Sequence, residues 1–287
     1  MLKRHKALLG ILLESPGLSS RTNLMMLAFL LRCESCLDHD QSLYDFVAYK
    51  HYPYSFTLHR DLEELKRLGY LGDGTLKMRR GFMARARRQF ESLDPFVREA
   101  VRTTMRRYGL LSLDALSRYV EKAHPWFRDW RKRGGKKRKT RSAKTTVYTA
   151  GYEGKSVDRF FQELLGKGIQ RVLDVRSNPV SRKYGFSKKA LTRLCGTLDV
   201  DYVHMPELGV PASWRSALRT PADYRKVLSR YGRVILPRVA EARLRASHLV
   251  KERPTALVCF EADARYCHRG LLARTIALQT RMSIVDL

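Results

Sequence analysis

The first 130 residues space their hydrophobic side chains three and four positions apart, which is the period of amphipathic helices. The pattern predicts helices over about residues 5–13, 20–36 and 55–68, and a short extended segment at Tyr70-Leu71. Two helices, a turn and a small β-wing are the elements of a winged-helix domain. The third helix would then be the recognition helix, and its outward-facing polar side chains would be His59, Arg60 and Lys66.

The pattern changes after residue 146, where short apolar runs alternate with helical segments. The apolar runs lie at 147–150, 172–175, 202–205 and 256–260, and the helical segments at 156–165, 187–195, 221–248 and about 267–278. Alternation of this kind predicts a parallel sheet with helices on both faces. We therefore expect a Rossmann-like α/β domain, preceded by the mainly helical winged-helix-like domain.

The distribution of charged residues predicts where the two domains are joined. The chain has 56 Lys and Arg against 28 Asp and Glu, a formal charge of +28, although 44% of its residues are hydrophobic. The eleven residues from 131 to 141 hold eight basic side chains and no apolar one, which predicts a flexible linker. We expect domains over 1–130 and 147–287, joined by a basic linker over 131–146. The linker residues expected to contact nucleic acid are Arg131, Lys132, Arg133, Lys136, Lys137, Arg138 and Lys139.

A second basic cluster runs from residue 79 to residue 107, where arginine occupies the polar side of one or two helices. It includes Arg79, Arg80, Arg87 and Arg88. Few acidic residues are interleaved, so phosphate contact is favoured, and double-stranded DNA is the expected partner. The alternative is a solvated helix face beside a linker.

The same sequence argues against a membrane partner. No apolar stretch approaches the roughly 18 residues that cross a bilayer, and the apolar run near the start is too short for a secretory signal. We expect a cytoplasmic, nucleoid-associated protein. Its five cysteines are an odd number with no disulfide spacing.

Metal and cofactor sites are not predicted. The spacing Cys33-x-x-Cys36-x-x-His39 lacks a fourth ligand, and a buried cysteine pair explains it equally well. In the second half, adjacent Cys267 and His268 rarely converge on one metal with Cys259. We therefore predict no metal and no cofactor.

Reactive side chains follow the predicted strand ends, where parallel sheets bind their ligands. We expect catalytic groups at Asp174, Glu261, His268 and Cys259. A carboxylate there would activate water or a sugar hydroxyl, an arginine pair would hold phosphate, and Tyr152 or Phe186 would stack on a base. The expected ligand-binding residues are Gly151, Tyr152, Glu153, Arg176, Asn178, Ser181, Glu207, Cys267 and Arg269.

Two alternatives stay open for these residues. Asp174 and Arg176 would form a purely structural ion pair in the first. In the second, the C-x5-R spacing from Cys259 to Arg265 would cradle an anion, as in rhodaneses. Glu261 and Asp263 inside that loop argue against the second.

Four blocks in the second half carry a family resemblance. TAGYEGKS at 149–156, LDVRSNPVSRKYGFSKKAL at 173–191, YVHMPELG at 202–209 and ALVCFEADARYCHR at 256–269 resemble, in order and spacing, the domain of unknown function 488 family. The resemblance implies an α/β fold and a motif set without a settled reaction. Its pattern falls on Gly151, Asp174, Arg176, Pro179, Ser181, Phe186, His204, Leu208, Gly209, Cys259, Glu261, Cys267, His268 and Arg269.

The first half also carries a resemblance. The runs YDFVAYKHYPYS at 44–55, DL at 61–62 and GYL at 69–71, with HPWF at 124–127, resemble the Panacea-type antitoxin domain. Ala48 and His51 depart from its usual pattern. The resemblance implies a protein partner as much as a DNA partner.

These observations lead to one expectation and two alternatives. We expect a DNA-binding protein whose second domain acts on or recognises a nucleotide, or a base, sugar or phosphate of nucleic acid, in DNA modification, repair or phage defence. A hydrolase or glycosylase is the expected enzyme type. The alternatives are a DNA-bound regulator or sensor without turnover and a sulfur-transfer enzyme that uses Cys259.

Overall fold

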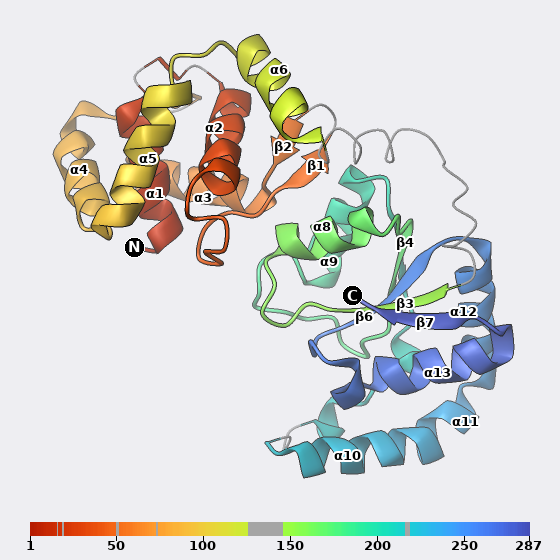
Figure 1. Cartoon of the computed structure of the whole chain (residues 1–287). Helices are drawn as coiled ribbons and strands as arrows, with labels where there is room; N and C mark the ends of the chain where they lie inside the picture. Colours follow the sequence, from red (N-terminus) through yellow and green to blue (C-terminus); the bar gives the residue numbers. More distant parts are fainter. Residues whose placement is uncertain (16, 19, 50–51, 73, 126–145, 216–218) are drawn as a thin grey trace. The chain divides into compact units, whose positions relative to one another are not determined.

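The computed structural model describes residues 1–287 except 16, 19, 50–51, 73, 126–145 and 216–218 (Figure 1). It divides into two compact units, Met1–Lys132 and Arg133–Leu287. The predicted linker lies outside the described residues except for Thr146. The linker residues expected to contact nucleic acid therefore stay a prediction.

The N-terminal unit is mainly helical. Its helices are α1 (Lys3–Glu14), α2 (Arg21–Glu34), α3 (Phe56–Arg67), α4 (Met83–Glu91), α5 (Pro95–Tyr108) and α6 (Leu113–Ala123), with a short 3-10 helix η1 (Arg80–Phe82). A hairpin of β1 (Val47–Tyr49) and β2 (Tyr52–Tyr54) precedes α3. The helices predicted over 5–13, 20–36 and 55–68 are confirmed within a few residues.

Local signals explain where these helices begin. Ser20 and Ser55 accept backbone hydrogen bonds as N-caps of α2 and α3, and Asp94 caps α5 just before Pro95. The helical spacing of Leu58, Leu62, Leu65 and Leu68 predicts one buried stripe. The first three are fully buried in the core of the unit, whereas Leu68, just after α3, is 40% exposed. A single antiparallel bridge joins Leu71 to Met78 at the predicted wing, whereas the β1–β2 hairpin was not predicted. The winged-helix assignment stays a prediction.

The C-terminal unit contains a five-stranded parallel sheet in the order β5-β4-β6-β3-β7. The strands are β3 (Thr146–Gly151), β4 (Arg171–Asp174), β5 (Asp201–His204), β6 (Thr255–Cys259) and β7 (Ser283–Asp286). The predicted parallel sheet is confirmed. The edge strand β7 was not predicted.

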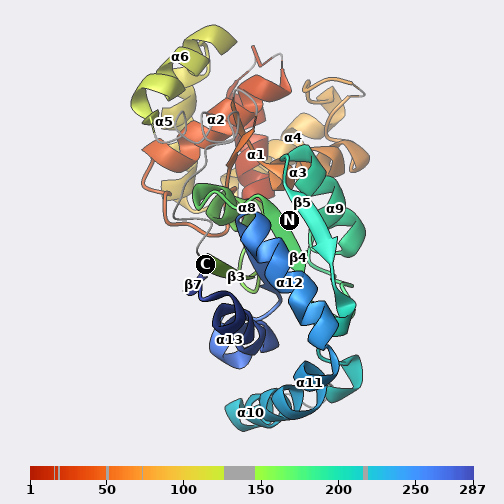
Figure 2. The same ribbon diagram turned by 90° about the vertical axis from the view of Figure 1, so that its right-hand side faces the viewer.

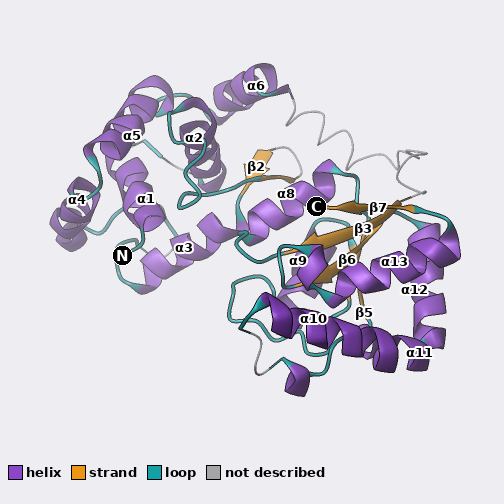
Figure 3. Cartoon of the chain, turned by 60° about the horizontal axis from the view of Figure 1, so that its bottom comes forward, coloured by secondary structure: helices purple, strands orange, loops and turns teal. Residues whose placement is uncertain are grey.

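Helices cover both faces of this sheet (Figures 2 and 3). From β3 the chain crosses through α8 (Val157–Gly166) to β4, and from β4 through α9 (Lys188–Thr197) to β5. The later crossovers, with α12 (Ala240–Glu252) and α13 (His268–Thr280), run in the opposite direction to β6 and β7. Because such crossovers are right-handed, opposite directions place their helices on opposite faces. The chain thus diverges between β3 and β6, where α/β sheets form a binding crevice.

The single helical region predicted over 221–248 is interrupted. It consists of α10 (Pro221–Arg230), a π-helical turn (Tyr231–Ile235), the short α11 (Leu236–Arg238) and α12. A π-turn inserts one extra residue per turn and is common near functional sites. Here it begins at Tyr231, whose side chain is completely buried.

No helix in the described part of the chain is both long and apolar enough to cross a membrane.

Candidate functional site

Four side chains that sequence placed in the site meet at the carboxyl end of β6. Cys259 ends that strand, Glu261 follows it, Cys267 precedes α13 and His268 begins α13. The Nδ1 atom of His268 lies 3.8 Å from Cys259 Sγ and 3.9 Å from Cys267 Sγ. Cys259 Sγ lies 3.3 Å from Glu261 Oε2, and Cys267 also contacts both Cys259 and Glu261. We call these four residues the strand-end cluster.

The backbone and one aromatic ring fix the orientation of His268. Its Nε2 lies 3.0 Å from the carbonyl oxygen of Val175, just after β4. The ring of Tyr231 packs edge-on against the imidazole at 5.3 Å between centroids, and the Tyr231 hydroxyl donates to the carbonyl of Leu208. The π-turn therefore supports one side of the cluster.

The burial of the cluster shifts its titration. Burial raises the pKa of Cys267 well above its ordinary value. Burial alone would raise the pKa of Glu261, but hydrogen bonds from Cys267 and Cys259 lower it. For His268, burial opposes the charged form, yet contacts with Cys267 and the Val175 carbonyl raise its pKa overall. The cluster therefore favours a carboxylate at Glu261.

Tyr224 of α10 lies within electrostatic range of this cluster. Burial raises its pKa, and the charges of Glu261 and Glu153 raise it further. Glu153 also accepts a hydrogen bond from the backbone N–H of Ala262 at 3.0 Å. Neither Tyr224 nor Tyr231 was a predicted site residue, because both lie in a region that the sequence pattern predicts as one continuous helix.

Asp174 and Arg176 form a buried ion pair beside the cluster. The Arg176 side chain donates two hydrogen bonds to Asp174, at 2.8 Å from Nε and 2.6 Å from Nη2, and its backbone N–H donates another at 3.2 Å. Tyr202 donates a fourth to Asp174 at 2.7 Å. Asp174 is 0% exposed and Arg176 is 2% exposed. The remaining contacts of Arg176 go to the hydroxyl of Tyr152 and the carbonyl of Phe186.

These contacts favour the structural alternative for the pair. Burial lowers the pKa of the Arg176 guanidinium, but the hydrogen bonds and charge of Asp174 raise it overall, so Arg176 stays charged. Tyr152 stacks on Phe186 at 4.2 Å with nearly parallel rings, and both rings are buried. Arg176, Tyr152 and Phe186 are thus buried, and their predicted roles in holding phosphate and in stacking on a base stay predictions.

Arg269 supports the loop after β6. It is 0% exposed and donates to the carbonyl oxygens of Glu261 and Ala262, at 2.5 and 2.8 Å. Gly151 lies against the same loop, since a Cβ on Gly151 would stand 2.0 Å from the Glu261 oxygen. Arg269 and Gly151 therefore hold the loop that carries Glu261 in place. Their ligand-binding roles stay predictions.

The other predicted ligand-binding residues contact residues outside the strand-end cluster or are exposed. Glu207 pairs with Arg245 at 2.9 Å. Ser181 hydrogen bonds to the Tyr152 hydroxyl, and Asn178 is exposed. Their ligand roles stay predictions.

The contacts of the loop from Cys259 to Arg265 argue against an anion cradle. Arg265 pairs with Asp263 at 2.7 Å on the surface. The backbone N–H groups of residues 262, 265, 266 and 267 all donate to acceptors of the protein. An anion cradle needs the N–H groups between Cys259 and Arg265 to face the ligand, and that of Ala262 already donates to Glu153.

The arginines of the second basic cluster, between residues 79 and 107, differ in their partners. Arg80, Arg87 and Arg88, on η1 and α4, are exposed and form no ion pair among the described residues. On α5, Arg102 pairs with Glu91, and Arg106 pairs with Glu99. Arg98 and Arg107 pair with Glu91 and Glu34. The glutamates that pair with the α5 arginines are seven or more residues away in sequence. The i,i+3 and i,i+4 spacing of a helix therefore does not reveal these pairs.

The predicted recognition helix presents fewer charges than expected. Arg60 donates from Nε and Nη2 to one carboxylate oxygen of the buried Asp61, and Lys66 pairs with Glu63 while only 13% of its side chain is exposed. His59 is half-buried, and Arg79 is exposed. The nucleic-acid roles of His59, Arg60 and Arg79 stay predictions.

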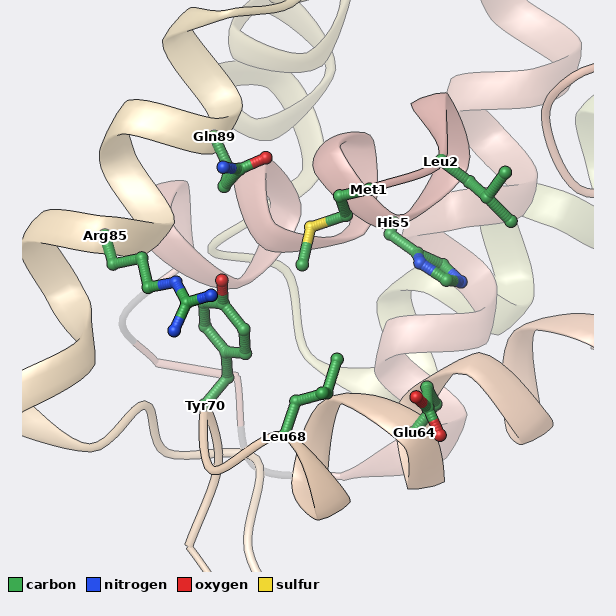
Figure 4. Close-up of a pocket in the computed structure, with 8 residues that line it drawn as sticks. All are labelled: Met1, Leu2, His5, Glu64, Leu68, Tyr70, Arg85 and Gln89. Atoms are coloured by element: carbon green, nitrogen blue, oxygen red, sulfur yellow. The ribbon is translucent and has the colours of Figure 1, made fainter.

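An open hollow of about 480 Å³ lies between α1, α3 and α4 (Figure 4). Figure 4 shows Tyr70 and Arg85 on one side of it, and the Arg85 guanidinium lies 5.7 Å from the Tyr70 ring centroid. Met1, Leu2 and Leu68 expose large parts of their side chains at this hollow. Its lining does not include the exposed Arg87 and Arg88.

The cysteines of the N-terminal unit do not converge with His39. The His39 side chain is 97% exposed and pairs with Asp38, and Cys36 is exposed while Cys33 is half-buried. Among the described residues, Cys259, Cys267 and His268 are the one group of three metal-ligating side chains whose ligand atoms lie within 4.8 Å of one another. The expectation that Cys267 and His268 do not converge with Cys259 is therefore wrong.

Comparison with protein families supports the C-terminal resemblance. Residues 156–276 match the family described as Domain of unknown function DUF488. The match includes the whole strand-end cluster and the Asp174–Arg176 pair. Comparison with curated proteins and with solved structures gives no match. The resemblance of the N-terminal half to a Panacea-type domain is not confirmed.

Proposed function

We propose that this protein binds double-stranded DNA through η1 and α4 of its N-terminal unit. We propose further that its C-terminal unit acts on a nucleotide or on a base, sugar or phosphate of nucleic acid. The observation that carries the first part is a set of exposed arginines without acidic partners among the described residues, Arg80, Arg87 and Arg88. Their charge is available to phosphate, whereas the arginines of α5 are already neutralised by glutamates.

The strand-end cluster supports the second part of the proposal. It lies at the carboxyl end of β6, beside the point where the crossovers diverge, and combines a half-buried carboxylate with an imidazole and two thiols. Such groups can move a proton to or from a bound substrate. Glu261 is the catalytic candidate with partial exposure, while Asp174 and Arg176 serve as positioning residues.

The second candidate is a regulator or sensor that binds DNA without turnover. The complete burial of Asp174 and its saturation by hydrogen bonds favour it, because one of the two proposed catalytic carboxylates has no access to substrate. Sulfur transfer through Cys259 is disfavoured by the closed loop around Arg265.

The test measures binding of the full chain to a labelled DNA duplex by fluorescence anisotropy at several salt concentrations. The logarithm of the affinity should fall linearly with the logarithm of salt, because each neutralised phosphate releases counterions. An affinity that does not change with salt would contradict the proposal. Incubation with duplex, single-stranded DNA, RNA and free nucleotides, followed by mass spectrometry, then distinguishes the enzyme from the sensor. Glu261→Gln should abolish any product and leave DNA affinity unchanged.

A further inference from the structure

Three ligand atoms of the strand-end cluster come from two places in the chain, the end of β6 and the adjacent residues Cys267 and His268. Cys259 ends a strand, Cys267 follows the 3-10 turn Ala264–Tyr266, and His268 opens a helix. Their side chains are 1%, 2% and 5% exposed in the same order. We propose that Cys259, Cys267 and His268, with Glu261 as the fourth ligand, bind one Zn²⁺ ion. This inference does not rest on the proposed function.

The distances within the cluster suit zinc. In a tetrahedral site with ordinary Zn–S and Zn–N bond lengths, a sulfur and a nitrogen ligand stand about 3.6 Å apart. The observed separations of His268 Nδ1 from the two sulfurs are 3.8 and 3.9 Å. A sulfur and a carboxylate oxygen should stand about 3.5 Å apart, and Cys259 and Glu261 show 3.3 Å. Glu261 stands outside the group of three whose ligand atoms lie within 4.8 Å of one another, so its side chain must move to complete the tetrahedron.

The hydrogen bond of His268 to the backbone also suits a metal. The carbonyl oxygen of Val175 can only accept a hydrogen bond, so the Nε2 atom that contacts it carries a proton. In neutral imidazole the lone pair is then on Nδ1, which faces the two sulfurs. Histidines that bind metals characteristically donate their other N–H to a carbonyl or carboxylate in this way. The Tyr231 ring holds the imidazole in this orientation.

The ligand types select the metal. Two thiolates and an imidazole favour zinc over the hard cations Mg²⁺ and Ca²⁺, which prefer oxygen ligands. Binding requires both thiols to lose their protons, so one Zn²⁺ would displace two protons into solvent. Glu261 is half-buried while the other three ligands are buried, which gives the ion a path to the site.

Direct hydrogen bonds among thiols, imidazole and carboxylate are the competing explanation. In that case the cluster is a buried polar network and needs no metal. The two explanations differ in what the purified protein contains.

The experiment measures the zinc content of the full chain, purified from zinc-supplemented cells without a metal-affinity tag, by mass spectrometry. We expect about one zinc per chain. Cys259→Ser and Cys267→Ser should each abolish it. Cys195→Ala, which removes a buried thiol of the same unit outside the cluster, and Cys36→Ser should retain it. Glu261→Gln should weaken zinc affinity by at least about 10-fold.

A second measurement on the wild-type chain tests the proposal even if the cysteine variants do not fold. The wild-type chain is stripped of metal with a chelator and titrated with Co²⁺, whose thiolate complexes absorb in the near ultraviolet. One equivalent should produce this absorption, and Zn²⁺ should displace the Co²⁺. Zinc-free wild-type protein that also shows no cobalt–thiolate absorption would overturn the proposal. Equal absorption in wild type and in Cys267→Ser would overturn it as well. DNA binding can fail or succeed independently of either result.

Discussion

The Nε2 atom of His268 lies 3.0 Å from the carbonyl oxygen of Val175, which ties the first residue of α13 to the end of β4. The two residues are 93 positions apart in sequence. Because β6 lies between β3 and β4 in the sheet, this contact spans the strand that carries Cys259. It sets both the position of the imidazole and the direction in which its second nitrogen points.

The buried Asp174–Arg176 pair should contribute strongly to stability. Asp174→Asn removes the negative charge and leaves the Arg176 guanidinium buried without a counter-charge. We expect the free energy of unfolding of the C-terminal unit to fall by about 3–5 kcal/mol. Urea unfolding followed by circular dichroism measures it.

The matched control for this variant is Asp263→Asn, which breaks a pair on the surface. Its partner Arg265 is 81% exposed, so solvent screens the interaction and the urea midpoint should hardly change. Equal unfolding midpoints for the two variants would contradict the positioning role of Asp174.

Two glycines of the C-terminal unit should respond to alanine with opposite signs. A Cβ at Gly151 would stand 2.0 Å from a backbone oxygen, so Gly151→Ala must displace the loop that carries Glu261. We expect it to lower the free energy of unfolding by about 2 kcal/mol or more. Gly196 lies in α9, and a Cβ added there would meet nothing within 4 Å, so Gly196→Ala should raise stability by up to about 1 kcal/mol. Thermal unfolding of both variants tests this, and a fall in stability for both would contradict it.

The stability of the N-terminal unit should decrease in acid because of Asp61. Burial alone would raise the pKa of this carboxyl, but hydrogen bonds from His5, Arg4 and Arg60 hold its pKa well below the ordinary value. A pKa depressed by folding stabilises the native state above the unfolded pKa, about 3.9, and that contribution is lost as pH falls below it. Between pH 6 and pH 3, the urea midpoint of wild type should therefore decrease.

Asp61→Asn provides the comparison for this pH dependence. The variant should be less stable than wild type at pH 6 and should lose less stability on acidification. Parallel pH profiles for the two proteins would show that other carboxyl groups control the acid response.

Sequence predicted the parts of the fold that depend on local pattern. Leu58, Leu62 and Leu65 recur at helical spacing and are buried, and the apolar runs of β3, β4 and β6 are buried strands. β7 was missed because Ser283–Asp286 is a short edge strand whose four residues are all exposed. Its hydrophobic pattern is too weak to distinguish a strand from an irregular C-terminal segment.

The geometry of the candidate site depends on contacts between residues far apart in sequence, which a local sequence pattern cannot predict. The 3-10 turn at Ala264–Tyr266 folds Cys267 and His268 back toward Cys259, so their convergence follows from a loop conformation. Asp174 and Cys259 lie at strand ends as expected, while the roles predicted for the site residues stay predictions. Asp174, Arg176 and Arg269 bond to the protein itself, which only packing reveals.

The central claim is that DNA binds to the exposed arginines that have no acidic partner in the described part of the chain. A triple variant with Arg80, Arg87 and Arg88 changed to alanine is compared with a control triple variant at Arg102, Arg106 and Arg107, which pair with glutamates. Both remove three positive charges, so net charge alone cannot distinguish them.

The decisive measurement is the slope of log affinity against log salt for duplex DNA in these two variants and wild type. We predict that the Arg80, Arg87 and Arg88 variant loses affinity and that its slope becomes shallower by about 2.7, the value for three lost phosphate contacts. The control variant should keep a slope close to that of wild type. Equal changes in both variants, or no change in either, would contradict the assignment of DNA binding to η1 and α4.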